Sequence, residues 1–494
     1  MKHLIRIFTI ILCGACVFMT TSCNSQKNNP LIDRTFFTKI YKEGFNIADD
    51  NTLATLDEYV EFMHNRVVES DSTYKVKKGA TVYYFSEKGS SINDGLSPES
   101  PKESLEDLSY LSLKSGDVVL FERGSIFRGT IKAQSGVTYS AYGEGAKPII
   151  CGSRRNFADP ALWKESDYEN VYVCTQSINN AGNIVFDNSW TIGDYTQTLG
   201  NLKVLNLDGF KGAQELNKDL DFYCDINKRI LYLYSDQGNP GERFDSIEIC
   251  ESGNLIDVTE KNNIIVDNLH LTLGGSHGVG ATSAKNLTVR NCIFDWIGGS
   301  ILQKTTRYGN AVECYVSSNG FYVYNNWIYQ IYDTGITTQY SQNPSLKYNI
   351  MKNNEYYNNI IEYCFWSFEY YHKMSPGVER VTENIYVHDN YCRLGGNGWG
   401  RKGSGHMCCF VPSGEKIKDV VIENNIFDGG RAVLVSSYSG KSTEFDYNKN
   451  IYVKERDGLL ARVEDTNYHM NDEALSVIND LVGDKKACVI CIDK

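Results

Sequence analysis

An all-β solenoid is the fold class that this 494-residue sequence predicts, and three observations support it. A short pattern recurs between residues 262 and 450: a β-branched or aromatic pair, one or two polar residues, an Asn and another apolar run. Its copies lie about 23 to 36 residues apart, a repeat length typical of solenoids. Tyr (33) and Phe (21) are abundant while Pro (9) is scarce, which favours strands. The copies contain Asn268, Asn291, Asn326, Asn354, Asn390 and Asn425.

The recurring Asn has a physical reason. Asn tolerates the left-handed backbone region, so it suits a corner between two strands. Stacked Asn side chains can also form a ladder of hydrogen bonds from one rung to the next. The unequal intervals predict long loops on some rungs, and such insertions often line the binding face of a solenoid.

The formal net charge is −12, from 61 acidic and 49 basic residues. This balance disfavours a nucleic acid partner, because a polyanion would be repelled. An acidic polysaccharide could still bind where Arg and Lys gather locally. We expect a monomer.

The N-terminus has the features of an export signal. Lys2, His3 and Arg6 supply a basic start, and the apolar stretch that ends at Met19 is short for a membrane span. Thr20-Thr21-Ser22-Cys23 resembles a bacterial lipoprotein cleavage site, which would make Cys23 the lipidated N-terminus. The alternative is an ordinary signal peptide cut nearby. We therefore expect a lipoprotein of the cell envelope, held to the outer membrane by its lipid, on the periplasmic or the surface side.

Twelve Cys follow Cys23, and they show no metal-binding spacing. Cys488 and Cys491 form an isolated Cys-x-x-Cys, which is a weak signal. Several others, such as Cys292 and Cys314, lie within apolar strand patterns, so we expect small buried side chains. Disulfides remain the alternative, because an exported protein meets an oxidising compartment.

The chain divides into six segments. Residues 1–22 are the signal peptide, and 23–79 are a lipid-anchored leader with a short helix from Asp57 to Val68. Residues 80–152 open the folded body as an N-terminal cap and first rungs. Residues 153–250 break the repeat, and alternating runs at 220–225 and 229–235 predict antiparallel hairpins. The repeats fill 251–465, and 466–494 form a C-terminal cap with a helix near 473–478.

Two stretches in the opening segment identify a family resemblance. The runs GDVVLFERGSIFRG (116–129) and YSAYGEGAKPII (139–150) resemble the N-terminal cap and first rungs of right-handed parallel β-helix proteins of the carbohydrate-active kind. Those families include glycoside hydrolases and polysaccharide lyases, and they are often lipoproteins of polysaccharide-degrading bacteria. The resemblance implies a right-handed parallel β-helix with an antiparallel β insertion and short capping helices. It is specific for the fold and says little about the reaction.

Alignment of the third strand of successive rungs predicts a column of carboxylates. Glu313 follows Val312, Thr337 follows Ile336, and Glu369 follows Phe368. The apolar member should point inward and its successor outward, which puts Glu313 and Glu369 two rungs apart, about 10 Å between backbones. Asp333 stands at the entrance to the intervening strand. A register slip of one residue would turn these side chains inward.

Two carboxylates on an outer face suit glycoside hydrolysis, in which one acts as acid and the other as base or nucleophile. A spacing of two rungs favours inversion. The segments YDTGITTQ (332–339) and WSFEYY (366–371) resemble segments of β-helix glycoside hydrolases, and this resemblance implies the carboxylate role for Asp333 and Glu369. Glu313 is the third candidate. The alternative for each is a solvated residue or a salt bridge between rungs, which is how we interpret Glu362, Glu423 and Asp428; Asp295 stays open.

Residue types that bind sugars surround this column. Aromatic side chains offer flat apolar faces for sugar rings, and His, Arg and Gln offer hydrogen bonds. Two glycine-rich stretches, 395–400 and 403–405, are flexible enough to close over a ligand. The alternative for each aromatic residue is the core, and for each His a structural role. The candidates are Arg307, Gln339, Trp366, Tyr370, Tyr371, His372, Trp399, Arg401 and His406.

Two other functions stay open. A polysaccharide lyase would need a basic residue, with Arg or Ca²⁺ to neutralise a uronate, and Lys304, Arg307, Arg401 and Lys402 could serve. The sequence has no compact Asp cluster for Ca²⁺. A non-catalytic glycan-binding lipoprotein is the third possibility. For a hydrolase we expect no metal and no cofactor, with Ca²⁺ only in the lyase.

Overall fold

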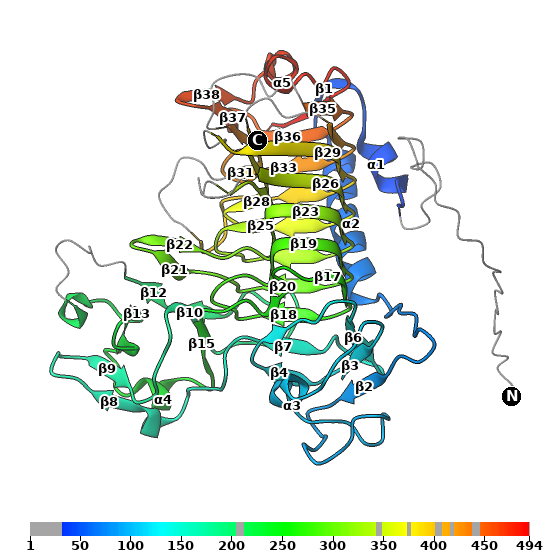
Figure 1. Cartoon of the computed structure of the whole chain (residues 1–494). Helices are drawn as coiled ribbons and strands as arrows, with labels where there is room; N and C mark the ends of the chain where they lie inside the picture. The colour runs from blue at the N-terminus through cyan, green and yellow to red at the C-terminus, as the bar shows by residue number, and fades with distance from the viewer. Residues whose placement is uncertain are drawn as a thin grey trace, which may run out of the picture.

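The computed structural model describes residues 32–203, 212–341, 348–372, 377–400, 408–414, 419–436 and 445–493. The signal segment and Cys23 lie outside these residues. The body is a right-handed parallel β-helix, so the predicted fold class is confirmed (Figure 1). Its coils stack into a cylinder whose wall has three faces, here called face 1, face 2 and face 3.

Face 1 is formed by the strands on which the sequence predicts the column of carboxylates. The long strands β19 (Val279–Arg290) and β23 (Val312–Tyr324) each run over face 1, bend at a left-handed residue, Ser283 (φ 55°) or Val316 (φ 68°), and continue over face 2. The other strands of face 1 are β5 (Ile131–Lys132), β16 (Ile256–Asp257), β25 (Thr334–Gln339), β28 (Trp366–His372), β31 (Cys408–Gly414), β34 (Leu434–Ser436) and β37 (Leu459–Val463).

Faces 2 and 3 complete the coil. Face 2 also contains β2 (Val82–Phe85), β3 (Val118–Glu122), β6 (Thr138–Tyr142), β17 (Asn262–Asp267), β26 (Tyr348–Tyr357), β29 (Glu379–His388), β32 (Val420–Glu423) and β35 (Phe445–Asn448). Face 3 contains β4 (Ile126–Arg128), β7 (Ile149–Cys151), β18 (His270–Thr272), β20 (Ile293–Asp295), β24 (Trp327–Tyr329), β27 (Ile360–Glu362), β30 (Tyr391–Arg393), β33 (Ile426–Asp428), β36 (Ile451–Glu455) and β39 (Cys488–Ile492).

An asparagine ladder fixes the corner between faces 2 and 3. Each ladder Asn donates its side-chain N–H to the next one's Oδ1: Asn326 to Asn359 at 2.9 Å, Asn359 to Asn390 at 2.9 Å and Asn390 to Asn425 at 3.0 Å. Asn450 extends the ladder, which ends on Asp484. The predicted ladder is therefore present at Asn326, Asn390 and Asn425.

The other predicted asparagines have different places. Asn268 (φ 62°) and Asn291 (φ 54°) take the left-handed conformation at the same corner, one residue before the ladder position. The assignment of Asn354 to this corner is wrong. Asn354 lies at another bend, where its side chain donates to Ser318 Oγ at 2.6 Å, and Asn359 holds the ladder position. This rung has an Asn-Asn pair at each of the two bends, 353–354 and 358–359, so the local pattern does not separate them.

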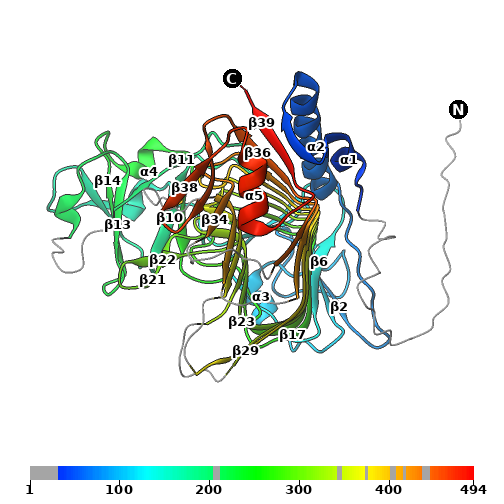
Figure 2. The ribbon, with the colours of Figure 1, turned by 90° about the horizontal axis from the view of Figure 1, so that it is seen from above.

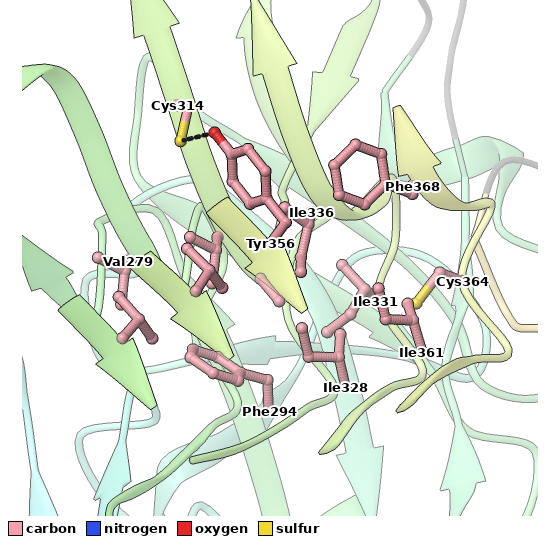
Figure 3. Close-up of a cluster of buried hydrophobic side chains, with 14 of the residues drawn as sticks. Val279, Phe294, Cys314, Ile328, Ile331, Ile336, Tyr356, Ile361, Cys364 and Phe368 are labelled. Atoms are coloured by element: carbon pink, nitrogen blue, oxygen red, sulfur yellow. Dashed lines mark hydrogen bonds between the residues drawn. The ribbon is translucent and has the colours of Figure 1, made fainter. Parts of the chain in front are cut away.

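The interior is filled by stacked apolar side chains from all three faces. Val279, Ile336 and Phe368 from face 1 meet Phe294, Ile328 and Ile361 from face 3 (Figure 3). Tyr356 donates its hydroxyl hydrogen to Cys314 Sγ at 3.2 Å within this core. The twelve Cys among the described residues are free and buried, as predicted for small core side chains.

The N-terminal leader forms a strap on face 3. It comprises α1 (Thr35–Ile40), β1 (Gly44–Ile47) and α2 (Asp50–Val68), and β1 pairs parallel with β39. Helix α2 packs its apolar side on Trp327, Ile360 and Tyr391. The helix is longer than the predicted one, because Asp49 accepts a capping hydrogen bond from the N–H of Thr52.

The insertion lies beside the cylinder and has its own core (Figure 1). The predicted hairpin is confirmed, since β13 (Asp221–Asp225) pairs antiparallel with β14 (Ile230–Tyr234). The insertion contacts a hairpin of the body, β21 (Ser300–Gln303) and β22 (Thr306–Tyr308), through Asn180 Nδ2, which donates to the Ile301 carbonyl at 2.8 Å. Its other elements are η2 (Pro160–Leu162), β8 (Trp163–Glu165), β9 (Val171–Cys174), β10 (Ala181–Phe186), β11 (Thr198–Leu199), β12 (Asn201–Leu202), η3 (Ala213–Glu215), α4 (Pro240–Arg243) and β15 (Ile247–Glu251).

Helices cover the two ends of the cylinder. Helix α3 (Leu105–Ser109) contributes Leu105 and Leu108 to the core at one end. At the other end β38 (Thr466–His469) and α5 (Ala474–Val482) lie over the last coil, as Figure 2 shows from above. Within the described residues, no helix is both long enough and apolar enough to cross a bilayer.

Candidate active site

The predicted column of carboxylates exists on face 1. In the register of the parallel strands, Glu313 pairs with Thr337, and Thr337 pairs with Glu369. The residues before them, such as Ile336, point inward and are fully buried. Glu313 and Glu369 therefore share one outward column, two rungs apart, at about 10 Å between backbones.

The same column continues upstream to a carboxylate that the sequence reasoning missed. Asp257 pairs with Gly280, and Gly280 pairs with Glu313, so Asp257 lies two rungs from Glu313 on the other side. A Cβ at position 280 would lie 2.1 Å from Asn254 Nδ2, so Gly280 leaves room for the Asn254 side chain. The signal was available: Ile256-Asp257-Val258 repeats the pattern of Val312-Glu313-Cys314.

His277, from the turn before β19, contacts Glu313. Its Nε2 lies 3.2 Å from Glu313 Oε1, and its Nδ1 accepts a hydrogen bond from the Asn310 N–H at 3.1 Å. Because Nδ1 accepts, the ring proton belongs on Nε2, which donates to Glu313. The ring of Tyr308 packs edge-on against His277 at 5.0 Å, and its hydroxyl lies 2.8 Å from Ser276 Oγ. These contacts fix the orientation of the imidazole.

Burial makes this pair neutral. It raises the pKa of Glu313 to about 8, and the negative charge of Asp257 adds to the effect. Burial also lowers the pKa of His277 to about 3, although Asp257 acts in the opposite direction. At neutral pH Glu313 therefore keeps its proton, and since Oε1 accepts from His277, that proton belongs on Oε2. A protonated carboxyl on an outer face is suited to general acid catalysis.

Glu369 is held in a different way. Thr337 Oγ1 donates to Glu369 Oε2 at 2.5 Å, and this short bond ties the two neighbours of the column together. Glu369 is 4% exposed and the Glu313 side chain 13% exposed. Both carboxyls thus point out of the cylinder yet are largely covered, whereas open outward positions were expected. This burial distinguishes Glu313 from an ordinary solvated Glu.

Asp333 lies where the sequence put it, at the entrance to β25. Its N–H donates to the Gly309 carbonyl, and its own carbonyl accepts from the Trp366 N–H. Thr337 lies four positions further along the chain, which corresponds to about 13 Å along the strand. Asp333 is therefore half-buried at the margin of the column and is not a member of it.

A second outward column runs beside the carboxylates. Thr282, Tyr315, Gln339 and Tyr371 are paired from strand to strand. All four are half-buried, and the Tyr315 hydroxyl donates to Ser341 Oγ at 3.1 Å. The structure thus brings two predicted binding residues, Gln339 and Tyr371, next to Thr337 and Glu369.

The prediction for Tyr370 is wrong. Side chains alternate along a strand, so an outward Glu369 requires an inward Tyr370. Tyr370 is fully buried in the core, where its ring packs edge-on against Phe445 at 5.0 Å.

Arg307 is also corrected from a substrate contact to a structural residue. It is buried in the β21–β22 hairpin, where Nη1 donates to the Gly299 carbonyl at 2.5 Å. Burial lowers the pKa of its guanidinium. The sequence placed Arg307 in an open loop, but the hairpin folds the side chain back on its own backbone.

The two predicted tryptophans flank the site without lying in its columns. Trp366 is half-buried against Cys408, Ala432 and Val435. Trp399 donates its indole N–H to the Gln330 carbonyl at 2.8 Å and packs on Tyr332 with ring centroids 5.2 Å apart. Arg401, His406 and the side chain of His372 lie outside the described residues.

The described residues provide little for the alternative chemistries. No group of three or more His, Cys, Asp and Glu side chains that could hold a metal ion occurs among them. Of the basic residues considered for a lyase, Lys304 is exposed at the hairpin tip, Arg307 is buried and bound, and Arg401 and Lys402 lie outside the described part of the chain.

Comparison with known proteins yields likeness of fold. No protein-family model matches the chain, and no curated protein sequence matches it. Among solved structures, XylC in complex with xylose is 13% identical with a TM-score of 0.47, over 77% of this chain and 66% of that one. The match therefore spans just under two thirds of that protein.

Two further structures are similar over most of the chain. GH136 lacto-N-biosidase from Eubacterium ramulus is 14% identical with a TM-score of 0.36, over 90% of this chain and 72% of that one. A rhamnogalacturonan lyase is 10% identical with a TM-score of 0.41, over 83% and 87%. The structural neighbours are carbohydrate-active enzymes. At these identities and TM-scores they decide neither the substrate nor the site of this chain.

Proposed function

We propose that this protein is a glycoside hydrolase whose acid is Glu313 and whose base is Glu369. One observation carries the proposal: a carboxyl with a pKa of about 8 shares an outward column with a second carboxylate two rungs away. Glycoside hydrolysis requires two carboxyl groups, one that gives a proton and one that accepts a proton or attacks the sugar.

The proposed reaction follows from this geometry. Glu313 Oε2 gives its proton to the glycosidic oxygen as the bond to the anomeric carbon breaks. Glu369 accepts a proton from a water whose oxygen bonds to the anomeric carbon from the opposite side. Two rungs, about 10 Å between backbones, leave room for that water, and carboxyl groups about 6.5–9.5 Å apart are typical of inversion. Proton exchange with solvent then restores both groups.

The neighbouring residues have positioning roles in this proposal. His277 orients Glu313 and leaves the acid proton on the free oxygen. Asp257 helps to keep Glu313 protonated through its negative charge. Tyr371 and Gln339, in the adjacent column, would contact the sugar from positions beside Glu369 and Thr337. Asp333 lies at the margin, where it can bind substrate but is far from Glu313.

The test is a screen of plant, algal and host glycans with detection of both reducing ends and unsaturated uronates. We expect reducing ends without unsaturated products, and an inverted anomer by NMR. Glu313→Gln and Glu369→Gln should each lower turnover at least about a hundredfold, and Asp333→Asn should lower it less. Full turnover by the first two variants would refute the assignment. Unsaturated products would identify a lyase, and retention of a glycan without cleavage a binding protein.

We further propose that Cys23 is lipidated and that the protein is a monomeric lipoprotein of the cell envelope. The motif Thr20-Thr21-Ser22-Cys23 supports this, and the strap α1–β1–α2 would join such an anchor to the body through face 3. Labelling with a fatty acid analogue should mark the wild type and not Cys23→Ala. Equal labelling of both would refute it.

A further inference from the structure

A groove lies on face 2, away from the column of carboxylates. It has a volume of about 970 Å³, within the range of sites for small ligands. One wall is the extended segment 72–77, which follows α2 and crosses over the sheet. The floor is formed by outward residues of β6, β17 and β19. The lining residues are Ser72, Thr73, Tyr74, Lys75, Lys77, Gly116, Gly136, Thr138, Asn263, Ile265, Asn286, Thr288 and Arg290.

The wall of this groove is fixed in place. The N–H of Thr73 donates to Asp267 Oδ2 at 3.0 Å, and Arg290 Nη2 donates to the Thr73 carbonyl. Arg290 Nε also bonds Asp267 Oδ1 at 3.2 Å, so one ion pair of the sheet holds both polar groups of the Thr73 backbone. The buried Asp267 receives a further bond from Asn291 Nδ2 at 2.8 Å. The groove is therefore formed before any ligand enters.

The charge of the lining opposes that of the whole molecule. Lys75, Lys77 and Arg290 line the groove, and no Asp or Glu is among its described lining residues. Asp267 offsets the charge of Arg290, so the net positive charge comes from the exposed Lys75 and Lys77. In a chain with a formal charge of −12, this local excess selects an anionic ligand.

The remaining lining groups suit a sugar. Thr138, Ile265 and Thr288 form one outward column, and the next residue in that column is Tyr322, whose side chain is 41% exposed. Tyr74 adds a second aromatic ring from the wall. The column thus alternates threonine hydroxyls with an aliphatic side chain, Ile265, and an aromatic one, Tyr322. Hydroxyls can bond the edges of pyranose rings, and apolar side chains can pack on their faces. The column runs along the cylinder axis, which suits an extended chain.

We propose that this groove binds an acidic oligosaccharide, one carrying carboxylate or sulfate groups, without cleaving it. Lys75 and Lys77 pair with the acidic groups, and Tyr74 and Tyr322 stack on the rings. The described lining residues include no carboxylate of the kind that hydrolysis needs, so we expect the site to bind glycan without cleaving it. It lies on another face from Glu313, and the proposal stands whether or not face 1 hydrolyses.

The experiment compares matched polymers. We expect the wild type to bind dextran sulfate and polygalacturonate in affinity electrophoresis, to bind neutral dextran weakly, and to lose affinity as salt rises. The double variant Lys75→Gln/Lys77→Gln should bind the acidic polymers about tenfold or more weakly. Tyr74→Ala should also weaken binding, while Tyr74→Phe should retain it.

The control is a second pair of exposed lysines, Lys164→Gln/Lys218→Gln, on the insertion. It has the same change in net charge and should keep wild-type affinity, and thermal melts should show that every variant is folded. Equal losses in the two double variants, or none in the groove variant, would overturn the proposal. So would binding to phosphatidylglycerol vesicles through Lys75 and Lys77 without binding to either acidic glycan, because the groove would then serve a lipid surface.

Discussion

Face 1 and face 3 each carry an outward column in which two carboxylates lie two rungs apart with a hydroxyl between them. On face 1 the order is Glu313, Thr337 and Glu369. On face 3 the order is Asp295, Tyr329 and Glu362, since the rungs are paired in sequence and Tyr329 pairs with Glu362. Spacing and residue type are nearly the same, so neither distinguishes a catalytic column from a structural one.

The hydrogen-bond donors around each carboxylate make the difference. Glu362 Oε1 accepts from Trp327 Nε1 at 3.0 Å and faces His64 Nε2 at 2.9 Å. Asp295 Oδ2 is approached by the Tyr329 hydroxyl at 2.6 Å and by His270 Nε2 at 2.9 Å. In contrast, among the described residues only His277 forms a polar contact with Glu313.

Burial with a single neutral partner favours the protonated form of a carboxyl, which is the situation of Glu313. On face 3, Glu362 holds the strap, because His64 belongs to α2. Among the described residues Glu313 forms a polar contact only with His277, in the turn before β19, and in our proposal its proton is the one transferred. The hydrogen-bond donors around a carboxylate, more than its position in a column, therefore distinguish Glu313 from the carboxylates of face 3.

The first prediction, with the largest expected effect, compares turnover after one carboxylate on each face is neutralised. Glu313→Gln should lower turnover about 10² to 10⁴-fold, the usual contribution of a general acid. Glu362→Gln should leave turnover within a few-fold of the wild type, because Glu362 lies on another face from the proposed site. Initial rates on the substrate found in the glycan screen provide the measurement. Equal losses in both variants would remove the distinction.

The control for Glu313→Gln is its stability as a function of pH. A carboxyl whose pKa rises on folding, here from 4.5 to about 8, stabilises the folded state below pH 4.5, and this contribution is lost as pH climbs through 8. The Gln variant cannot ionise. It should melt at or above the wild type at pH 9, and the difference should narrow at pH 4. A variant that melts well below the wild type at pH 9 would mean that lost activity reflects unfolding.

The second prediction concerns the strap. Glu362→Gln should lower the free energy of unfolding by about 1–3 kcal/mol, because the amide presents an N–H where His64, Trp327 or Arg393 also donates. Limited proteolysis should then cut the segment 32–68 faster, and urea denaturation should give the free energy. Glu61→Gln, on the exposed side of α2, is the matched control and should change neither. An unchanged rate of cleavage would show that Glu362 does not hold the strap.

The third prediction tests whether the charge of Asp257 helps to raise the pKa of Glu313. In the proposed mechanism activity requires the protonated form of Glu313, so activity should fall as pH rises through about 8. Asp257→Asn removes a nearby negative charge, which should lower the pKa of Glu313 and move this alkaline limb down by up to about one pH unit. The pH profile of kcat/KM measures it. Glu61→Gln should leave the alkaline limb of the pH profile unchanged. If Asp257→Asn also leaves it unchanged, the charge of Asp257 is not a cause of the raised pKa of Glu313.

The sequence predicted the solenoid and much of the column because both follow from local periodicity. Alternation of side chains along a strand put Glu313 and Glu369 outward, and the same rule applied to Tyr370 would have placed it in the core. It would also have found Asp257, since Ile256-Asp257-Val258 repeats the same pattern. Asn354 was misassigned because two Asn-Asn pairs of the same rung, 353–354 and 358–359, both fit the pattern expected at the corner.

Other parts of the site depend on contacts between distant segments. His277 reaches Glu313 from a turn, and Arg307 folds back into its own hairpin, and no periodic pattern encodes either. The groove on face 2 needs a segment before β2 to cross strands that follow much later in the chain.

By itself, the sequence determined a coil with a fixed rung, Asn at its corners and acidic residues on its outer side, because backbone alternation and corner geometry are local properties. Only the tertiary structure decided which acidic residues are buried, how many donors each receives and where positive charge gathers. Those quantities depend on neighbours brought together from distant parts of the chain, and they separate Glu313, the proton donor that we propose on face 1, from Glu362, which binds the strap on face 3.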